Sequence, residues 1–203
     1  MKIDIATHNK DKFKELYRGL SSLSVNLLSL NDFPQIGEIV EDGKTLLENA
    51  FIKAREVYRI TGFPAISDDT GLEVDALNGE PGVFTARFAG ENCSYDDNVN
   101  KMLDVMKNIP LEKRQAQFKT VMCYISEKTE LTSEGVVEGI ISNEKKGLQG
   151  FGYDPIFYVP EEGKTFAEMS IERKNIISHR GKAIQALRSS LSSHLITLSK
   201  ENA

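Results

Sequence analysis

The chain has 203 residues, of which 40% are hydrophobic and 27% are charged, and its formal net charge is −5. This length fits one large domain or two closely fused lobes and is sufficient to bury a core without disulfide bonds. The acidic balance argues against a general nucleic-acid binder, which needs a basic surface to neutralise phosphates. Local lysines and arginines can still form a positive pocket for a small polyanion.

The cysteine content and the hydropathy pattern indicate the cellular environment. Cys93 and Cys123 have no CxxC spacing, so neither a zinc site nor a disulfide framework is expected, and a reducing cytosol fits. The sequence contains no apolar run of membrane-spanning length and no cleavable signal pattern. We therefore expect a cytoplasmic protein with neither a membrane nor a nucleic acid as its partner.

The first third of the chain predicts a strand, a helix, a second strand and a longer helix. Residues 2–6 form an apolar strand that runs into a polar loop, and apolar residues in 10–20 have helical spacing. A short strand is expected over 25–30. Thr45 is the predicted N-cap of the next helix, with Glu48 at the position that a capping box requires.

The rest of the chain intermixes strands and helices without a strict βαβ rhythm. A short strand at 65–67 is expected to end at Asp68-Asp69-Thr70-Gly71, and strand-like alternation resumes at 72–77. The pattern further predicts a helix at 95–106, a hairpin of 115–127 and 131–142, and a final helix at 178–191. These elements indicate an α/β or mixed α+β fold: a mixed sheet in two lobes with a cleft between them.

The polar loop after the first strand is a candidate phosphate site. A helix N-terminus offers free N–H groups and a partial positive charge, and two lysines add full charges. An ordinary capped turn with solvated lysines is the alternative. The loop residues are Thr7, His8, Asn9, Lys10, Asp11 and Lys12.

Acidic residues at the ends of elements are candidate metal ligands. Glu41 and Asp42 precede a glycine, and Asp68 and Asp69 follow a strand. Mg²⁺ takes hard oxygen ligands and often only one or two protein carboxylates. Because Asp and Gly also favour turns, a turn and a metal site are equally compatible with the second pair.

Two other phosphate-handling motifs are excluded. Gly163-Lys164-Thr165 resembles the end of a P-loop, but Tyr158 stands where that motif needs glycine. A haloacid-type phosphatase needs Asp-x-Asp after its first strand, and Asp4 is followed two residues later by Ala6.

Two further groups could bind a nucleoside. Gly150-Phe151-Gly152-Tyr153-Asp154-Pro155 combines glycines, which permit close backbone approach, with aromatic rings that could stack on a base. Lys174, His179 and Arg180 lie at or before the start of the last helix and could donate hydrogen bonds to a purine or a phosphate. The alternatives are a turn whose aromatic rings fill the core and exposed helical charges.

Taken together, these motifs resemble the inosine triphosphate pyrophosphatase family, also described as dITP/XTP pyrophosphatases. The resemblance extends from Lys2 to about Ser193 and departs from the usual pattern at His8, often Gly, and at Thr70, usually Ser. The motifs are Thr7-His8-Asn9-Lys10-Asp11-Lys12, Glu41-Asp42-Gly43, Glu48-Asn49-Ala50 with Lys53-Ala54, Ser67-Asp68-Asp69-Thr70-Gly71, Pro81-Gly82 with Ala86-Arg87, Gly150-Phe151-Gly152-Tyr153-Asp154-Pro155 and Ser178-His179-Arg180-Gly181.

The resemblance implies one elongated mixed α/β domain over residues 1–203 with flanking helices, a deep nucleotide-binding cleft and a homodimer. It implies that Glu41 and Asp69 hold Mg²⁺ and that Asp69 also accepts the proton of water. Thr7 to Lys12, Lys53 and Thr70 would bind phosphate. The nucleoside would be surrounded by Phe151, Gly152, Tyr153, Asp154, Lys174, His179 and Arg180.

The implied activity is Mg²⁺-dependent hydrolysis of nonstandard purine nucleoside triphosphates (ITP, dITP and XTP) to the monophosphate and pyrophosphate. Donors from Lys174, His179 or Arg180 would satisfy the 6-keto oxygen of the base and oppose an amine. Two alternatives are a Maf-like pyrophosphatase for other modified nucleotides and a non-catalytic nucleotide sensor. The presence of Glu41, Lys53 and Asp69 favours catalysis.

Overall fold

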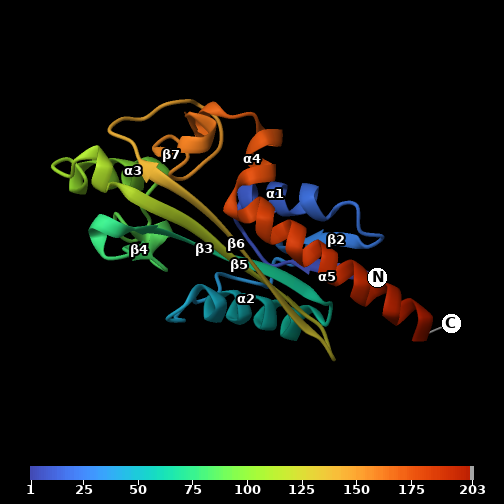
Figure 1. The fold of residues 1–203 in the computed structure, drawn as a ribbon. Coiled ribbons are helices and arrows are strands. Elements are labelled where there is room, and N and C mark those ends of the chain that lie inside the picture. Colours follow the sequence, from blue (N-terminus) through green and yellow to red (C-terminus); the bar gives the residue numbers. More distant parts are fainter. Residues whose placement is uncertain (202–203) are drawn as a thin grey trace. The chain divides into compact units, whose positions relative to one another are not determined.

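The computed structural model describes residues 1–201, which form helices and strands in mixed order (Figure 1). The helices are α1 (Lys10–Leu20), α2 (Leu46–Thr61), α3 (Tyr95–Val105), α4 (Ile171–Ile177) and α5 (His179–Glu201). The strands are β1 (Lys2–Ile5), β2 (Asn26–Ser29), β3 (Ala65–Val74), β4 (Pro81–Gly82), β5 (Gln115–Ile125), β6 (Glu130–Ile141), β7 (Phe157–Val159) and β8 (Lys164–Thr165).

The strands form one mixed sheet. Their order is β2-β1-β3-β5-β6-β7-β8, and β4 pairs with β3 off this path. β1 runs parallel to both β2 and β3, whereas the pairs β3–β4, β6–β7 and β7–β8 are antiparallel. This topology confirms the predicted mixed α/β class.

The chain divides into two compact units. Unit 1 comprises Met1–Asp69, Thr120–Gly135 and the chain from Arg180 onward, and unit 2 comprises Thr70–Lys119 and Val136–His179. β3, β5 and β6 therefore contribute residues to both units.

Unit 1 has an apolar layer on each face of β1 and β3. One layer includes Ile3, Ile5 and Ile66 and packs against apolar residues of α1 and α5. The other includes Ala65 and packs against α2, which lies on the opposite side of these strands from α1 and α5 (Figure 1). The alternation of side chains along a strand produces this division, because successive residues point to opposite faces.

Local signals fix the ends of α2. Thr45 accepts a hydrogen bond from the amide of Glu48, and the Glu48 carboxylate accepts from the amide of Thr45, so the predicted capping box is confirmed. The helix ends at Gly62, whose φ of 71° is the left-handed conformation that glycine adopts without steric cost. A cap of this kind stabilises a helix by about 1 kcal/mol.

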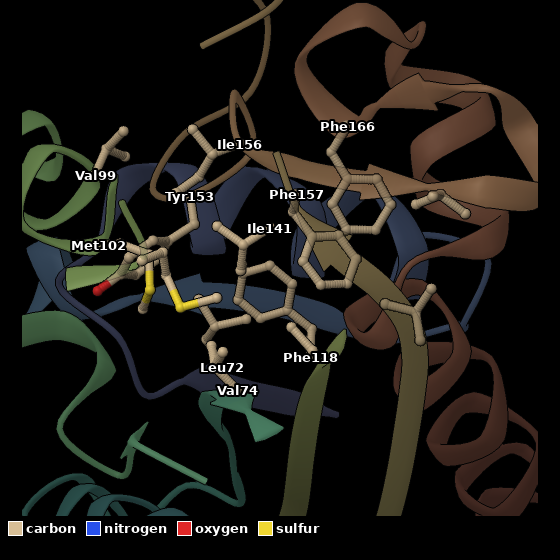
Figure 2. Close-up of a cluster of buried hydrophobic side chains, with 14 of the residues drawn as sticks. Leu72, Val74, Val99, Met102, Phe118, Ile141, Tyr153, Ile156, Phe157 and Phe166 are labelled. Carbon is tan, nitrogen blue, oxygen red and sulfur yellow. The ribbon is translucent and has the colours of Figure 1, made fainter. Parts of the chain in front are cut away.

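Unit 2 has its own core, in which the rings of Phe118, Tyr153, Phe157 and Phe166 pack among aliphatic and methionine side chains (Figure 2). The ring of Phe118 on β5 lies 4.7 Å, centroid to centroid, from that of Phe157 on β7, which is 5.1 Å from Phe166. Val99 and Met102 of α3 add the apolar face of a helix. Burying each such large side chain contributes about 1.5–3 kcal/mol.

Some of the predicted boundaries are wrong. The strand expected to end at Ser67 continues without interruption through Asp68 and Asp69 to Val74. Aspartate disfavours strands, but charged partners on both faces compensate here. The final helix extends beyond residue 191, and α4 was not predicted. No helix within residues 1–201 is both long and apolar enough to span a membrane.

Candidate active site

Asn9 organises the polar loop between β1 and α1. Its side-chain oxygen accepts hydrogen bonds from the amides of Asp11 and Lys12, at 3.0 and 3.1 Å, and caps the helix. Thr7 Oγ1 accepts from the amide of Asn9 at 3.2 Å. Two first-turn amides that could contact a phosphate are therefore already bonded to Asn9. The groups that the loop can present to a phosphate are mainly its side chains.

The three basic residues of this loop have different environments. Lys10 and His8 are exposed, and His8 Nε2 lies 3.1 Å from the carbonyl oxygen of Gly37. The Lys12 ammonium instead turns inward and lies 3.3 Å from Asp68 Oδ2. Burial lowers the pKa of Lys12, and the attraction of Asp68 only partly offsets this effect.

The pleat of β3 sends the two adjacent aspartates to opposite faces. Ser67 points toward α2, where its hydroxyl donates to the carbonyl oxygen of Ala50 at 2.5 Å. Asp69 lies on this same face, whereas Asp68 shares the face of Ile66. Each carboxylate therefore meets a different set of partners.

Asp68 lies in a buried network of charges. Its Oδ2 accepts from Nε of Arg180 at 3.1 Å, and Nη1 of Arg180 donates to Glu15 Oε2 at 2.8 Å. The side chain of Asp68 has 0% exposure and that of Arg180 has 3%. Burial opposes ionisation of Asp68, but Lys12 and Arg180 outweigh it and hold its pKa far below the usual range. The carboxylates of Asp68 and Glu15 raise the pKa of Arg180, although burial acts in the opposite direction.

Asp69 meets Lys53 of α2. The Lys53 ammonium lies 3.1 Å from Asp69 Oδ1 and 2.6 Å from Glu41 Oε2, so it links the two carboxylates. Burial lowers the pKa of Lys53, but Asp69 and Glu41 outweigh it and the net pKa is raised. Asn49, one helical turn earlier, donates to Asp69 Oδ2 at 3.2 Å.

The residues of this second cluster fit a magnesium ion. Glu41 and Asp69 converge on one point, because both contact the same ammonium. Within residues 1–201 there is no group of three or more His, Cys, Asp or Glu side chains arranged to hold a metal. Glu41 and Asp69 could still hold Mg²⁺, which often takes only one or two protein carboxylates and completes its shell with water and substrate phosphates.

A separate cluster in unit 2 contains the predicted nucleoside-binding residues. Asp154 Oδ2 accepts from Lys174 Nζ at 2.6 Å and from the amide of Phe151 at 2.8 Å. The Lys174 ammonium also lies 4.7 Å from the centre of the Phe151 ring. Gly150 has a φ of +78°, and a Cβ atom there would collide with the Asp154 carboxylate. The glycine is therefore needed for the close approach of this loop to Asp154.

His179 and Tyr153 are anchored in the core of unit 2. The imidazole stacks on the Phe118 ring with centroids 4.5 Å apart and planes at 18°. The Tyr153 hydroxyl donates to the carbonyl oxygen of Thr85 at 3.0 Å, and burial raises the pKa of Tyr153. Gly152 and Thr70 are partly exposed.

The structure thus brings the predicted residues together in two groups, one in each unit. In unit 1, Glu41, Lys53 and Asp69 meet on one face of β3. Lys12 and Arg180 meet Asp68 on the other face, so Arg180 does not join the predicted nucleoside group. Phe151, Asp154 and Lys174 form a contact cluster in unit 2, and His179 packs on Phe118 in the same unit.

Sequence reasoning missed the role of Glu15 and did not assign one to Asn49. Glu15 meets Arg180 across 165 positions of the chain, and no local pattern reports such a contact. Asn49 gave a usable signal, because it lies four residues before Lys53 and so on the same helix face.

The fold and these clusters define a mixed α/β protein whose carboxylates and cations gather on the two faces of one strand. The model of the Ham1 family matches residues 3–190. A dITP/XTP pyrophosphatase of Elusimicrobium minutum is 48% identical over 192 residues, covering 92% of this chain and 98% of the relative. The corresponding protein of Geobacter sulfurreducens is 46% identical over 188 residues, covering 92% and 94%.

A solved structure gives the same result. The HAM1 protein from Coxiella burnetii superposes with a TM-score of 0.87 at 39% identity, covering 95% of this chain and 99% of that one. The chain belongs to the Ham1 family. The family resemblance inferred from its motifs is confirmed.

Proposed function

We propose that this chain hydrolyses nonstandard purine nucleoside triphosphates (ITP, dITP and XTP) to the monophosphate and pyrophosphate. The observation that carries the proposal is the convergence of Glu41, Lys53 and Asp69 at one point of a Ham1-family chain. Relatives that match nearly the whole chain are named dITP/XTP pyrophosphatases. A Maf-like pyrophosphatase and a non-catalytic sensor have no comparable support.

The proposed chemistry uses the charged residues of unit 1. Water attacks the α-phosphorus, and pyrophosphate leaves with additional negative charge. Lys12 and Lys53 neutralise charge on the phosphates, and Asp69 accepts the proton of the attacking water. A Mg²⁺ ion held by Glu41 and Asp69 would supply further positive charge at the phosphate oxygens. The remaining residues from Thr7 to Asp11, together with Thr70, are proposed to contact the triphosphate.

Base recognition is assigned to the cluster in unit 2. Lys174 and His179 are proposed to donate to the 6-keto oxygen of hypoxanthine or xanthine, with the loop from Phe151 to Asp154 against the base. Unpaired buried donors would then penalise the 6-amino group of adenine, by a factor on the order of 10⁴. Arg180 is bonded to Asp68 and Glu15, so its effect on the base is the least direct.

The decisive experiment is a panel of ITP, XTP, GTP, ATP and their deoxy forms with Mg²⁺, followed by chromatography of the products. We expect rapid release of pyrophosphate from ITP and XTP, slow turnover of ATP and loss of activity in excess chelator. Orthophosphate as the first product from ITP would refute attack at the α-phosphorus. Full turnover in chelator would refute the metal assignment.

A second experiment tests base recognition. If His179 or Arg180 donates to the 6-keto oxygen, its replacement by alanine lowers kcat/KM for ITP about ten- to a hundredfold and narrows the ITP-to-ATP ratio. If the residue acts only on phosphate or on the fold, both substrates suffer equally. A flat ratio in both variants would transfer base selection to Lys174, to the Phe151–Asp154 loop or to backbone groups.

A homodimer and a nucleotide-binding cleft stay predictions from the family resemblance, and a cytoplasmic location stays a prediction from the cysteine content and the hydropathy pattern. Sedimentation of the purified protein at several concentrations tests the dimer, because a stable dimer keeps twice the mass of the chain on dilution. Fractionation of cells that express the full protein tests the location.

A further inference from the structure

Asn49 links two segments that the proposed chemistry requires. It lies on α2, has 2% exposure, and its Nδ2 donates to Asp69 Oδ2 at 3.2 Å. Its Oδ1 accepts from the amide of Gly43 at 2.8 Å. One carboxamide therefore ties the segment that contains Glu41 to the carboxylate of Asp69.

The chemistry of the two partners sets the direction of this carboxamide. A backbone N–H can only donate, and an ionised carboxylate can only accept. Among side chains of this size, only asparagine presents an acceptor to the first and a donor to the second. Aspartate would place a second acceptor against Asp69, and leucine would leave both partners without their bond.

Gly43 gives independent support for a tight contact. A Cβ atom at this position would lie 2.6 Å from Asn49 Oδ1 and 2.8 Å from Glu48 Cβ. No Cβ atom tolerates such distances, so the segment can approach the start of α2 this closely only with glycine there. The Glu48 carboxylate accepts from the amides of Lys44 and Thr45 and fixes the following residues.

We propose that Asn49 is a positioning residue, which holds the Glu41–Gly43 segment and Asp69 in one geometry. Lys53 makes a parallel link through charge, since it contacts both Glu41 and Asp69. Asn49 differs because it is neutral and directional: it orients Asp69 through Oδ2 and leaves Oδ1 to Lys53. The catalytic consequence rests on the proposed function, whereas the link itself does not.

Two variants and a matched control separate the two ends of the link. Asn49→Asp keeps the acceptor for Gly43 and removes the donor to Asp69, and Gly43→Ala disrupts the Gly43 end and leaves the donor in place. Asn100→Asp is the control, because Asn100 also donates to an aspartate, Asp96, at 3.0 Å, but at an exposed site on α3.

Hydrogen exchange at the Gly43 amide tests the link between Gly43 and Asn49 independently of enzyme activity. In the wild type the Gly43 amide is protected by its bond to Asn49. We expect its exchange to accelerate about three- to tenfold in Asn49→Ala and in Gly43→Ala and to stay unchanged in Asn49→Asp. Combining Asn49→Ala with Gly43→Ala should add little, because both remove the same bond. Unchanged exchange in a folded Asn49→Ala protein would overturn the link.

Steady-state kinetics with ITP test whether the positioning by Asn49 matters for catalysis. We expect Asn49→Asp to lower kcat at least about tenfold with KM within about threefold, because misorienting Asp69 affects the transition state more than substrate binding. Asn100→Asp should match the wild type. Normal kcat in Asn49→Asp would overturn the positioning role. If the wild type releases no pyrophosphate from ITP, the proposed function fails, and the exchange result still decides the link.

Discussion

The buried ion pairs of Arg180 make a quantitative prediction. Arg180→Met keeps an extended side chain but removes the guanidinium that contacts Asp68 at 3.1 Å and Glu15 at 2.8 Å. Removing one partner of a buried ion pair costs about 3–5 kcal/mol, because the other charge stays buried without compensation. Lys12 remains 3.3 Å from Asp68, so we expect the lower end, about 3 kcal/mol.

Thermal and urea unfolding test this value. About 3 kcal/mol should lower Tm by about 6–12 °C in a chain of this size. Arg59→Met is the control, because Arg59 pairs with Glu56 on the exposed surface of α2, where such a pair contributes less than about 1 kcal/mol. In an Asp68→Asn background, Arg180→Met should cost at least about 1 kcal/mol less than alone.

The loss of stability in Arg180→Met should also depend on pH. The pKa of Asp68 in the folded protein is depressed, so its ionic stabilisation is present above the unfolded pKa of about 3.9 and is lost as pH falls further. The deficit of Arg180→Met should therefore be largest near neutral pH and shrink in acid. A Tm within 1 °C of the control (roughly 0.3 kcal/mol), or a deficit that grows in acid, would refute this account of the network.

Three further predictions concern single residues. Asp69→Asn should keep the fold, seen by circular dichroism, and lose nearly all turnover, because an amide accepts no proton; a near wild-type kcat would reject the assignment. Gly150→Ala should destabilise the protein by more than about 1 kcal/mol in urea unfolding, because φ is +78° and the new methyl group meets Asp154. Burial raises the pKa of Asp4, so wild-type stability is lost as pH rises from about 4 through the raised pKa. Over that pH interval, the free energy of unfolding of Asp4→Asn should rise relative to that of the wild type. A relative fall, measured in paired unfolding curves, would contradict this.

Local signals in the sequence predicted α1 and α2 of unit 1 well. The bounds of α1 and the capping box of α2 depend on residues only a few positions apart, such as Thr45 and Glu48. The motifs also named most of the residues that form the charged clusters, although their roles stay predictions. What brought Glu41, Lys53 and Asp69 to one point, however, is the packing of α2 on β3, and spacing alone does not specify that contact.

The errors come from contacts between distant residues. Asp68-Asp69-Thr70-Gly71 has the composition of a turn, yet it lies inside β3, because Arg180, 112 positions away, compensates Asp68 within the sheet. Arg180 and His179 were both expected near the base. These two residues are adjacent at the start of α5, but Arg180 pairs with Asp68 whereas His179 stacks on the Phe118 ring. A sequence pattern does not show that neighbouring side chains have such different partners.

The alternation of Asp68 and Asp69 makes β3 sensitive to changes in chain length. If Ser67 were deleted, each following residue would shift to the opposite face of the sheet. Asp69 would then occupy the place of Asp68 and could still compensate the buried guanidinium, whereas Lys53 would face the hydroxyl of Thr70 in place of a carboxylate. A single deletion would thus leave a carboxylate at Arg180 and remove the one at Lys53, where the proposed hydrolysis uses it. The same shift would put Asp68 in the buried place of Ser67, against the carbonyl oxygen of Ala50, and would turn Leu72 and Val74 away from the core of unit 2. Insertions and deletions of one residue in this strand should therefore cost stability as well as activity.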